Sequence, residues 1–139
     1  MIRTLSHCSR QLHNHRLPVV GCRFMAGIFI SFIHEEVDIA DGVRNFLRKK
    51  LGQGTKVFLS SDKWTVLAGE DWLKRVKDEL TSAKIVVLML SEISVQRPWV
   101  NFEAGAGWLY NKVLIPVCFG GLHKGAMPKP YSAFHRQGV

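Results

Sequence analysis

The run KIVVLML at residues 84–90 constrains the fold of this chain more than any other segment. After its first lysine it is wholly apolar, without the alternation of a strand that keeps one face in water. It is far shorter than the roughly 20 residues that cross a bilayer. A run of this kind is typical of a central strand in a parallel sheet, buried on both faces. The rest of the chain must therefore supply helices for both faces.

Short apolar runs alternate with segments of helical periodicity along most of the sequence. Proline suits the first turn of a helix, and glycine suits the position just after a helix, which makes Pro98 a helix start and Gly52 a C-cap. Alternating strands and helices predict an α/β three-layer sandwich with a mainly parallel sheet. The predicted strands are 27–33, 56–60, 84–90 and 113–119, and the predicted helices are 35–51, 71–83 and Pro98 to about Tyr110.

Two predictions concern the edges of the predicted sheet. Pro116 cannot donate a ladder hydrogen bond, so the strand at 113–119 should lie near an edge. In open α/β sheets, ligands bind outside the carboxyl ends of the strands. The loops at 33–36, 60–70 and 91–98 lie at that edge, so we expect functional residues there.

Charge and cysteine content limit the kinds of function that this chain is expected to have. The net charge is +8, and four arginines without any acidic residue place +4 of it within residues 1–24. No basic stripe interleaved with aromatic residues is present, so nucleic-acid binding is not expected. Three cysteines and six histidines show neither a disulfide framework nor metal-ligand spacing. We expect no metal, no membrane span and a reducing, cytoplasmic location.

Residues 1–25 differ in composition from the rest of the chain and are interpreted as a basic extension to a single domain at 26–139. Three interpretations stay open: a transit-like targeting segment, a flexible basic arm, or an upstream start codon ahead of Met25. We favour a disordered or dispensable extension. The remaining length suits one domain with its own core.

The segment RPWVNFEAGAGWLYNK poses a question about Glu103, the only charged residue between Arg97 and Lys112. It is either a solvated position on a half-buried helix or a carboxylate kept for chemistry. The nearby Gly105 and Gly107 lack the spacing of a dinucleotide fingerprint. Each costs about 1 kcal/mol against alanine within a helix. Close packing of this helix on the sheet is the favoured explanation for both glycines.

Six segments occur in the order of a TIR domain, the Toll/interleukin-1 receptor type, and the chain looks most like its bacterial branch. The resemblance covers roughly residues 26–135. Each segment alone is unspecific, but the six segments in this order are specific to the family. It implies a flavodoxin-like fold, usually of five strands. Only four are clear here, so the fifth strand and last helix are expected to be missing or shortened, as in a C-terminally truncated domain. The segments are GIFISFIH, VFLSSDKW, AGEDW, VVLMLSE, RPWVNFEAG and VLIPVCF.

Many TIR domains that this chain resembles cleave NAD at the nicotinamide–ribose bond, giving nicotinamide and ADP-ribose or a cyclic isomer. Trp99 and Glu103 match the family's W-x-x-x-E pattern, which implies that Glu103 is catalytic and that Trp99 walls the substrate pocket. One carboxylate is enough, because nicotinamide leaves a pyridinium as a neutral molecule and needs no general acid. NAD would be a substrate, and no cofactor is expected.

The resemblance implies further substrate contacts and a mode of assembly. Active sites in the family are completed by a neighbouring copy, so self-association through the 61–70 loop is expected. A TIR-containing protein or a sensor protein is the expected partner. The implied role is in signalling or in defence against phage or stress. The alternative is a non-catalytic TIR scaffold that acts through the same loop; a truncated, inactive relic is a third. The implied substrate-binding residues besides Trp99 are Phe32, His34, Ser60, Asp62 and Trp64.

Overall fold

The computed structural model describes residues 27–61 and 69–134 of the chain. The strands are β1 (Gly27–Phe32), β2 (Val57–Ser61), β3 (Ala83–Leu90) and β4 (Val113–Cys118). The helices are α1 (Val37–Leu51), α3 (Gly69–Ser82), α4 (Pro98–Leu109) and α5 (Tyr131–Phe134), with 3-10 turns η1 (His34–Glu36), η2 (Ser94–Gln96) and η3 (Lys124–Ala126).

The described strands form one four-stranded sheet in the order β2-β1-β3-β4, and every neighbouring pair is parallel. The predicted α/β sandwich is therefore confirmed. KIVVLML lies within the central strand β3, whose last five residues are all buried. Pro116 lies in the edge strand β4, as predicted, in register with Leu88. The fifth strand usual in the family was predicted to be missing or shortened, and it is absent from the described residues, where the turn η3 and the short helix α5 follow β4.

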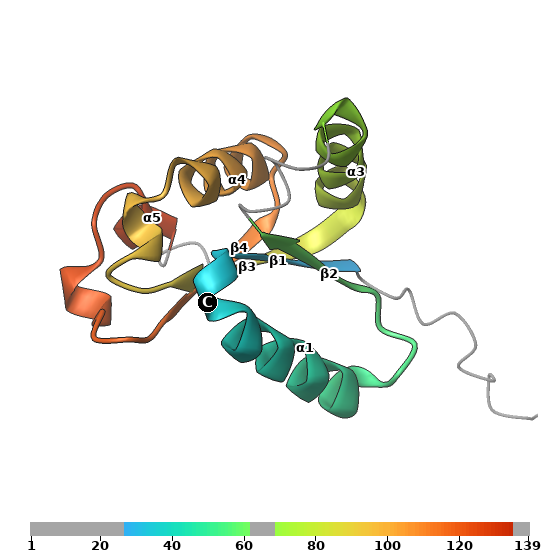
Figure 1. Cartoon of the computed structure of the whole chain (residues 1–139), viewed down its shortest axis with the longest axis horizontal. Helices are drawn as coiled ribbons and strands as arrows, with labels where there is room; N and C mark the ends of the chain where they lie inside the picture. Colours follow the sequence, from blue (N-terminus) through green and yellow to red (C-terminus); the bar gives the residue numbers. More distant parts are fainter. Residues whose placement is uncertain (1–26, 62–68, 135–139) are drawn as a thin grey trace, which may run out of the picture.

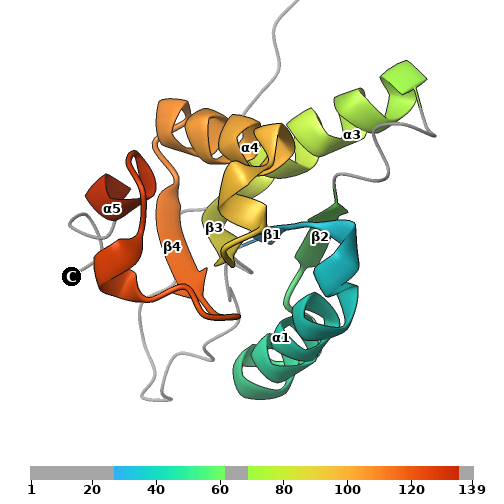
Figure 2. The ribbon, with the colours of Figure 1, turned by 60° about the vertical axis from the view of Figure 1, so that its left-hand side comes forward.

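Helices cover both faces of the sheet (Figures 1 and 2). Helix α1 packs on one face, where alternate residues of β1, Ile28, Ile30 and Phe32, form a core with Ala40. Helices α3 and α4 cover the other face, where Phe29 and Ile33 belong to the core. The period of two in a strand sends neighbouring residues to opposite faces, so β1 contributes to both cores. Among the described residues, no helix has the length and apolar character that a bilayer crossing needs.

The ends of two helices agree with the predicted signals. Gly52 follows α1 with φ of 105°, which favours glycine, and its N–H donates to the carbonyl of Arg48 at 2.9 Å. Pro98 opens α4, where its missing N–H leaves no intrahelical bond unmade. Since α4 begins after the carboxyl end of β3, its first turns lie at the edge of the sheet where ligands are expected.

The two glycines of α4 differ in their surroundings. Gly107 is buried, and a Cβ there would lie 2.8 Å from Cδ2 of Leu114 and 3.4 Å from Cγ2 of Val86. Close packing of α4 on the sheet therefore explains this glycine, as predicted. A Cβ at Gly105 would meet no described atom within 4 Å. The packing explanation does not extend to Gly105.

Helix α5 is fixed to α4 through one side chain. The Tyr131 ring is buried, and its hydroxyl donates to Oδ1 of Asn101 at 2.7 Å. The amide of Asn101 in turn donates to the carbonyl of Arg97 at 3.1 Å. Burial raises the pKa of Tyr131 to about 12, from an ordinary value of 10.0. The neutral phenol of Tyr131 thus helps to hold α5 against α4, and it can donate this hydrogen bond only while it stays protonated.

We predict opposite effects from alanine at the two glycines. Gly105→Ala should raise the free energy of unfolding by about 0.5–1 kcal/mol, because it adds helix propensity in open space. Gly107→Ala should lower it by about 1 kcal/mol or more, because the new methyl group must displace Leu114. Urea denaturation of both variants measures the difference, and equal effects would contradict the packing explanation.

A second prediction concerns Tyr131 at high pH. The folded-state pKa lies above the unfolded one, so this contribution to stability is complete below about pH 10 and is lost as the pH rises toward 12. The wild type should therefore lose stability over this range more steeply than Tyr131→Phe, which has no hydroxyl to ionise. At neutral pH the variant should be less stable by about 1 kcal/mol, for the lost hydrogen bond. Thermal melts at pH 7, 10 and 11 test both points.

Candidate functional site

The sheet reverses its direction of growth between β1 and β3. In open α/β sheets, ligands bind in a crevice outside the carboxyl ends of the strands at such a switch point. The turn η1 follows β1, and η2 leads from β3 into α4. Glu35 of the first turn and Arg97 before α4 form an ion pair at 2.7 Å. Both side chains are substantially exposed, so the pair adds little stability, but it joins the segments that follow β1 and β3.

Glu103 lies in the second turn of α4, close to this crevice, and its side chain faces inward. It is 0% exposed, and it is the one buried side chain with a formal charge among the described residues. The hydroxyl of Ser60, near the end of β2, donates a hydrogen bond to its Oε1. The half-exposed helix position considered from the sequence is therefore wrong. A buried carboxylate is expensive unless it is hydrogen-bonded, and Ser60 is one of its partners.

Ser60 and Ser31 form a pair of buried polar residues, here called the polar rung, within an otherwise apolar part of the sheet. Ser31 of β1 is the partner of Ser60 in the parallel register, and both serines are 0% exposed. The pair two residues earlier, Phe29 and Phe58, is aromatic, and its ring centroids lie 5.4 Å apart. Phe29 belongs to the core under α3 and α4, and Phe58 packs against that core. The two serines face the same way, because side chains two residues apart share one face of a strand. The oxygen of Ser31 has no hydrogen-bond partner among the described residues.

Trp99 precedes Glu103 by one helical turn, as the W-x-x-x-E pattern requires. It is half-buried against the core on the α4 face and stacks on Phe102, with ring centroids 5.5 Å apart. Its indole N–H is buried and donates to no group among the described residues. The ring lies one turn from Glu103 on the same side of α4.

The other predicted site residues separate into four groups. Ser60 contacts Glu103 directly. Phe32 is buried in the core under α1, on the opposite face of the sheet from Glu103, so the structure does not bring these two side chains together. His34 is exposed in η1, at the crevice. Asp62 and Trp64 lie outside the described residues, as does most of the 61–70 loop.

Trp72 has a structural role. It packs against the core and stacks on Phe58, with centroids 5.8 Å apart. Ser31 lies beside Ser60 in the parallel register, as the ends of GIFIS and VFLS (27–31 and 57–60) show once the strands are aligned. Its oxygen has no hydrogen-bond partner among the described residues, so Ser31 is a neighbour of the site and not a part of it.

An apolar groove of about 280 Å³ runs between α3 and α4. Its rim includes large side chains that remain substantially exposed, Leu73 at 49% and Phe102 at 59%. An apolar helix that keeps such side chains in water is typical of an interaction surface. The groove is lined by Leu73, Val76, Lys77, Leu80, Phe102, Ala106 and Tyr110.

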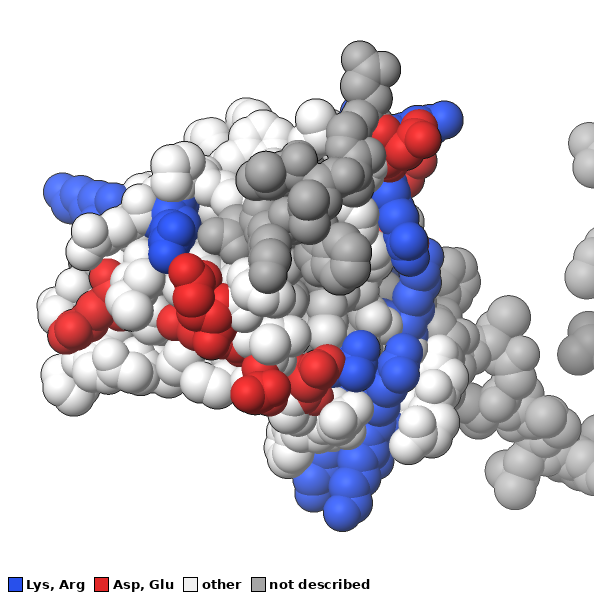
Figure 3. Space-filling view, in the orientation of Figure 1, with Lys and Arg blue, Asp and Glu red and all other residues white. Residues whose placement is uncertain are grey.

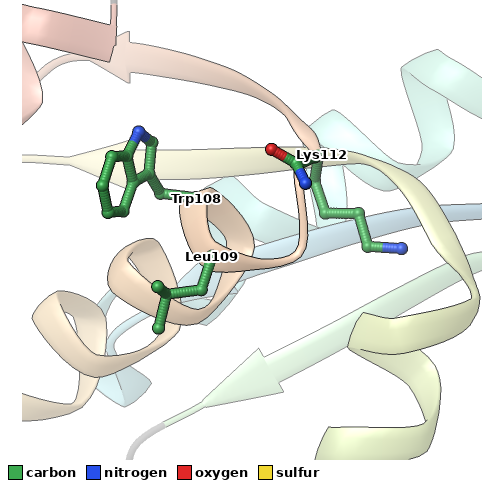
Figure 4. Close-up of a pocket in the computed structure, with 4 residues that line it drawn as sticks. Trp108, Leu109 and Lys112 are labelled. Atoms are coloured by element: carbon green, nitrogen blue, oxygen red, sulfur yellow. The ribbon is translucent and has the colours of Figure 1, made fainter.

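A larger, open hollow of about 460 Å³ lies near the amino end of β4, at the edge of the sheet opposite the carboxyl ends of the strands (Figure 4). Trp108 and Leu109 project from the last turn of α4, and Lys112 precedes β4. The amine of Lys112 donates to the carbonyl of Thr81. The residues that line this hollow do not include Glu103, and they lie toward the amino edge of the sheet, where α4 ends. Its size therefore does not mark the site of chemistry.

Figure 3 shows the charged side chains on one face of the molecule. Asp and Glu gather at the left and lower middle of the view and at its upper right, whereas Lys and Arg follow the right-hand side and the lower end, with a smaller group at the left. The last turn of α1 contributes Arg48, Lys49 and Lys50. Among the described residues, no three His, Cys, Asp or Glu side chains are grouped as metal ligands.

The parallel sheet with helices on both faces defines an α/β domain of the flavodoxin-like type, and sequence comparison identifies its family. The family model described as the TIR domain matches residues 28–137, so the chain belongs to the TIR domain family. No curated protein matches the sequence significantly.

A solved structure gives the same fold. The metazoan TIR-STING receptor from C. gigas superimposes with a TM-score of 0.56 and 25% sequence identity. The match covers 77% of this chain and 35% of the receptor. The chain thus spans about a third of that protein's length.

The polar rung yields a stability prediction with an internal control. Ser60→Ala removes a donor from a buried carboxylate and should lower the free energy of unfolding by about 1–3 kcal/mol. Ser31→Ala removes a buried hydroxyl that has no partner among the described residues, and it should leave stability unchanged or raise it slightly. Urea denaturation of the two variants measures this contrast, and equal losses would contradict the assigned hydrogen bond.

Proposed function

We propose that this TIR domain is an NAD glycohydrolase that cleaves the nicotinamide–ribose bond, with Glu103 as its catalytic carboxylate. The observation that carries the proposal is the complete burial of Glu103 at the carboxyl edge of the sheet, one turn after Trp99. Folding without a functional need would favour an apolar side chain at this position, since burying a carboxylate is costly. Membership of the TIR family supports the same assignment.

The reaction needs one negative group beside the ribose. The bond between the ribose carbon and the nicotinamide nitrogen breaks, and its electron pair stays on nitrogen, so nicotinamide leaves neutral. The ribose becomes an oxocarbenium ion, whose positive charge the Glu103 carboxylate stabilises at short range in a site that excludes water. Water then attacks the same carbon and loses a proton, which gives ADP-ribose. Attack by a nitrogen of the adenine instead would give a cyclic isomer.

The neighbouring residues suit the supporting roles. Trp99 offers a flat apolar ring one turn from the carboxylate, suited to nicotinamide. His34 lies at the crevice, within the part of the site that the resemblance assigns to substrate. We keep Phe32, Asp62 and Trp64 as predicted substrate contacts, with Phe32 acting through the backbone at the end of β1, since its side chain is buried under α1.

Access to Glu103 requires a change of conformation. The carboxylate has no exposed surface in the single chain, so NAD cannot contact it until the site opens. We propose that self-association, including the 61–70 loop, causes this opening.

A second candidate function is a TIR scaffold that binds other TIR domains without catalysis. The observation that favours it is the apolar groove between α3 and α4, with Leu73 and Phe102 largely exposed. The similarity to part of a TIR-STING receptor supports a role in signalling under either function. The bacterial branch and a role in defence remain predictions from the sequence resemblance.

The glycohydrolase proposal predicts a specific loss in one variant. Wild-type protein at high concentration with a crowding agent should consume NAD and release nicotinamide, as followed by chromatography. Glu103→Gln keeps the shape of the side chain but removes its charge, so the rate should fall by at least about a thousandfold. Its thermal unfolding should remain cooperative.

Two outcomes would contradict the proposal. Equal NAD loss in both proteins would mean that Glu103 is structural. No NAD loss from folded wild type that nevertheless self-associates would favour the scaffold, and Glu103→Gln should then associate as the wild type does. Replacing Phe102 by serine on the exposed groove should weaken that association.

A further inference from the structure

We propose that Ser60 is a positioning residue for Glu103, whose hydroxyl holds the carboxylate in its working orientation and does not itself contact NAD. The proposal rests on the proposed function, because it assigns Ser60 a part in the reaction of Glu103. It changes the role that the family resemblance implies for Ser60, from contact with the substrate to support of the catalytic group.

The positions of the two side chains in the fold support this division of roles. The Ser60 oxygen is two bonds from the backbone of a strand that pairs with β1 through Ser31, and the residue is 0% exposed. Apart from rotation about one bond, it moves only with the sheet. Glu103 has three rotatable bonds and projects from a helix. A fixed donor can therefore select one orientation of a flexible carboxylate, and such preorganisation accounts for much of enzymatic rate enhancement.

The chemistry of a hydroxyl suits this role better than that of a cation. Serine donates one hydrogen bond to the carboxylate and brings no charge. A lysine or arginine in the same place would neutralise the carboxylate and compete with the positive charge that develops on the ribose. Among the described residues, Glu103 is the one buried side chain with a formal charge. Ser60 therefore orients the carboxylate without weakening its field at the reacting carbon.

Ser31 provides a matched control for this role. It has the same side chain, lies beside Ser60 in the register, faces the same side of the sheet and is also 0% exposed. Its oxygen donates to no group among the described residues. Removing the same atom one strand away therefore reproduces the change in packing without removing a donor from Glu103.

The experiment measures kcat and KM for NAD in the full chain, under the conditions in which the wild type is active. Ser60→Ala should lower kcat by roughly ten- to a hundredfold and leave KM within about twofold, because a positioning hydrogen bond acts on the reaction step. Ser60→Cys keeps nearly the same shape but donates poorly, so it should resemble Ser60→Ala. Ser31→Ala should keep kcat and KM within about twofold of wild type. A cooperative thermal transition establishes that each variant is folded.

Each outcome distinguishes this inference from the function on which it rests. Full activity in Ser60→Ala or Ser60→Cys, with Glu103→Gln inactive, would overturn the positioning role and leave the glycohydrolase intact. A rise in KM with unchanged kcat would mean that Ser60 binds substrate after all. Higher activity in Ser60→Ala would identify the hydrogen bond as a restraint on Glu103 and would also overturn the proposal. Inactive wild type, or an active Glu103→Gln, would remove the proposed function and the positioning role together.

Discussion

The hydrogen bond from Ser60 to the buried carboxylate of Glu103 is the interaction on which the candidate site depends. It joins the edge strand β2 to the helix α4, two elements that are separated by 43 positions in the sequence. It also explains how a charged side chain persists without exposure to water in a face of the sheet that is otherwise packed with aromatic and aliphatic residues. Under the proposed function, catalysis and stability make opposing demands on this side chain, as is common at functional sites.

The fold was largely predictable because each element carries its own local signal. The apolar run at 84–90 required cover on both faces, and α1 on one side with α3 and α4 on the other provide it. Pro98, Pro116 and Gly52 each stand where backbone chemistry alone would place them. Gly107 was explained by packing, whereas its neighbour Gly105 was not, because spacing alone does not reveal which glycine faces the sheet.

The site was predictable only in part, because it depends on contacts between distant segments. Sequence reasoning singled out Glu103 and Trp99 from one helix, but it could not decide whether Glu103 faced water or the core. The depth of burial depends on how α4 is rotated on the sheet, and that rotation is set by Gly107, Val100 and Ala104 together. Ser60 was predicted as a substrate contact, but its hydrogen bond to Glu103 was not, because that bond joins two segments 43 positions apart in the sequence.

The central claim is that Glu103 is a catalytic carboxylate that is closed off in the single chain and becomes accessible on association. The most direct test is the initial rate of nicotinamide release per chain, measured over a wide range of protein concentration. We predict that this specific rate rises steeply with concentration and then reaches a plateau, as assembly opens the buried site. A specific rate that is already maximal for the isolated chain would contradict the claim, as would the absence of nicotinamide release from chains that have associated.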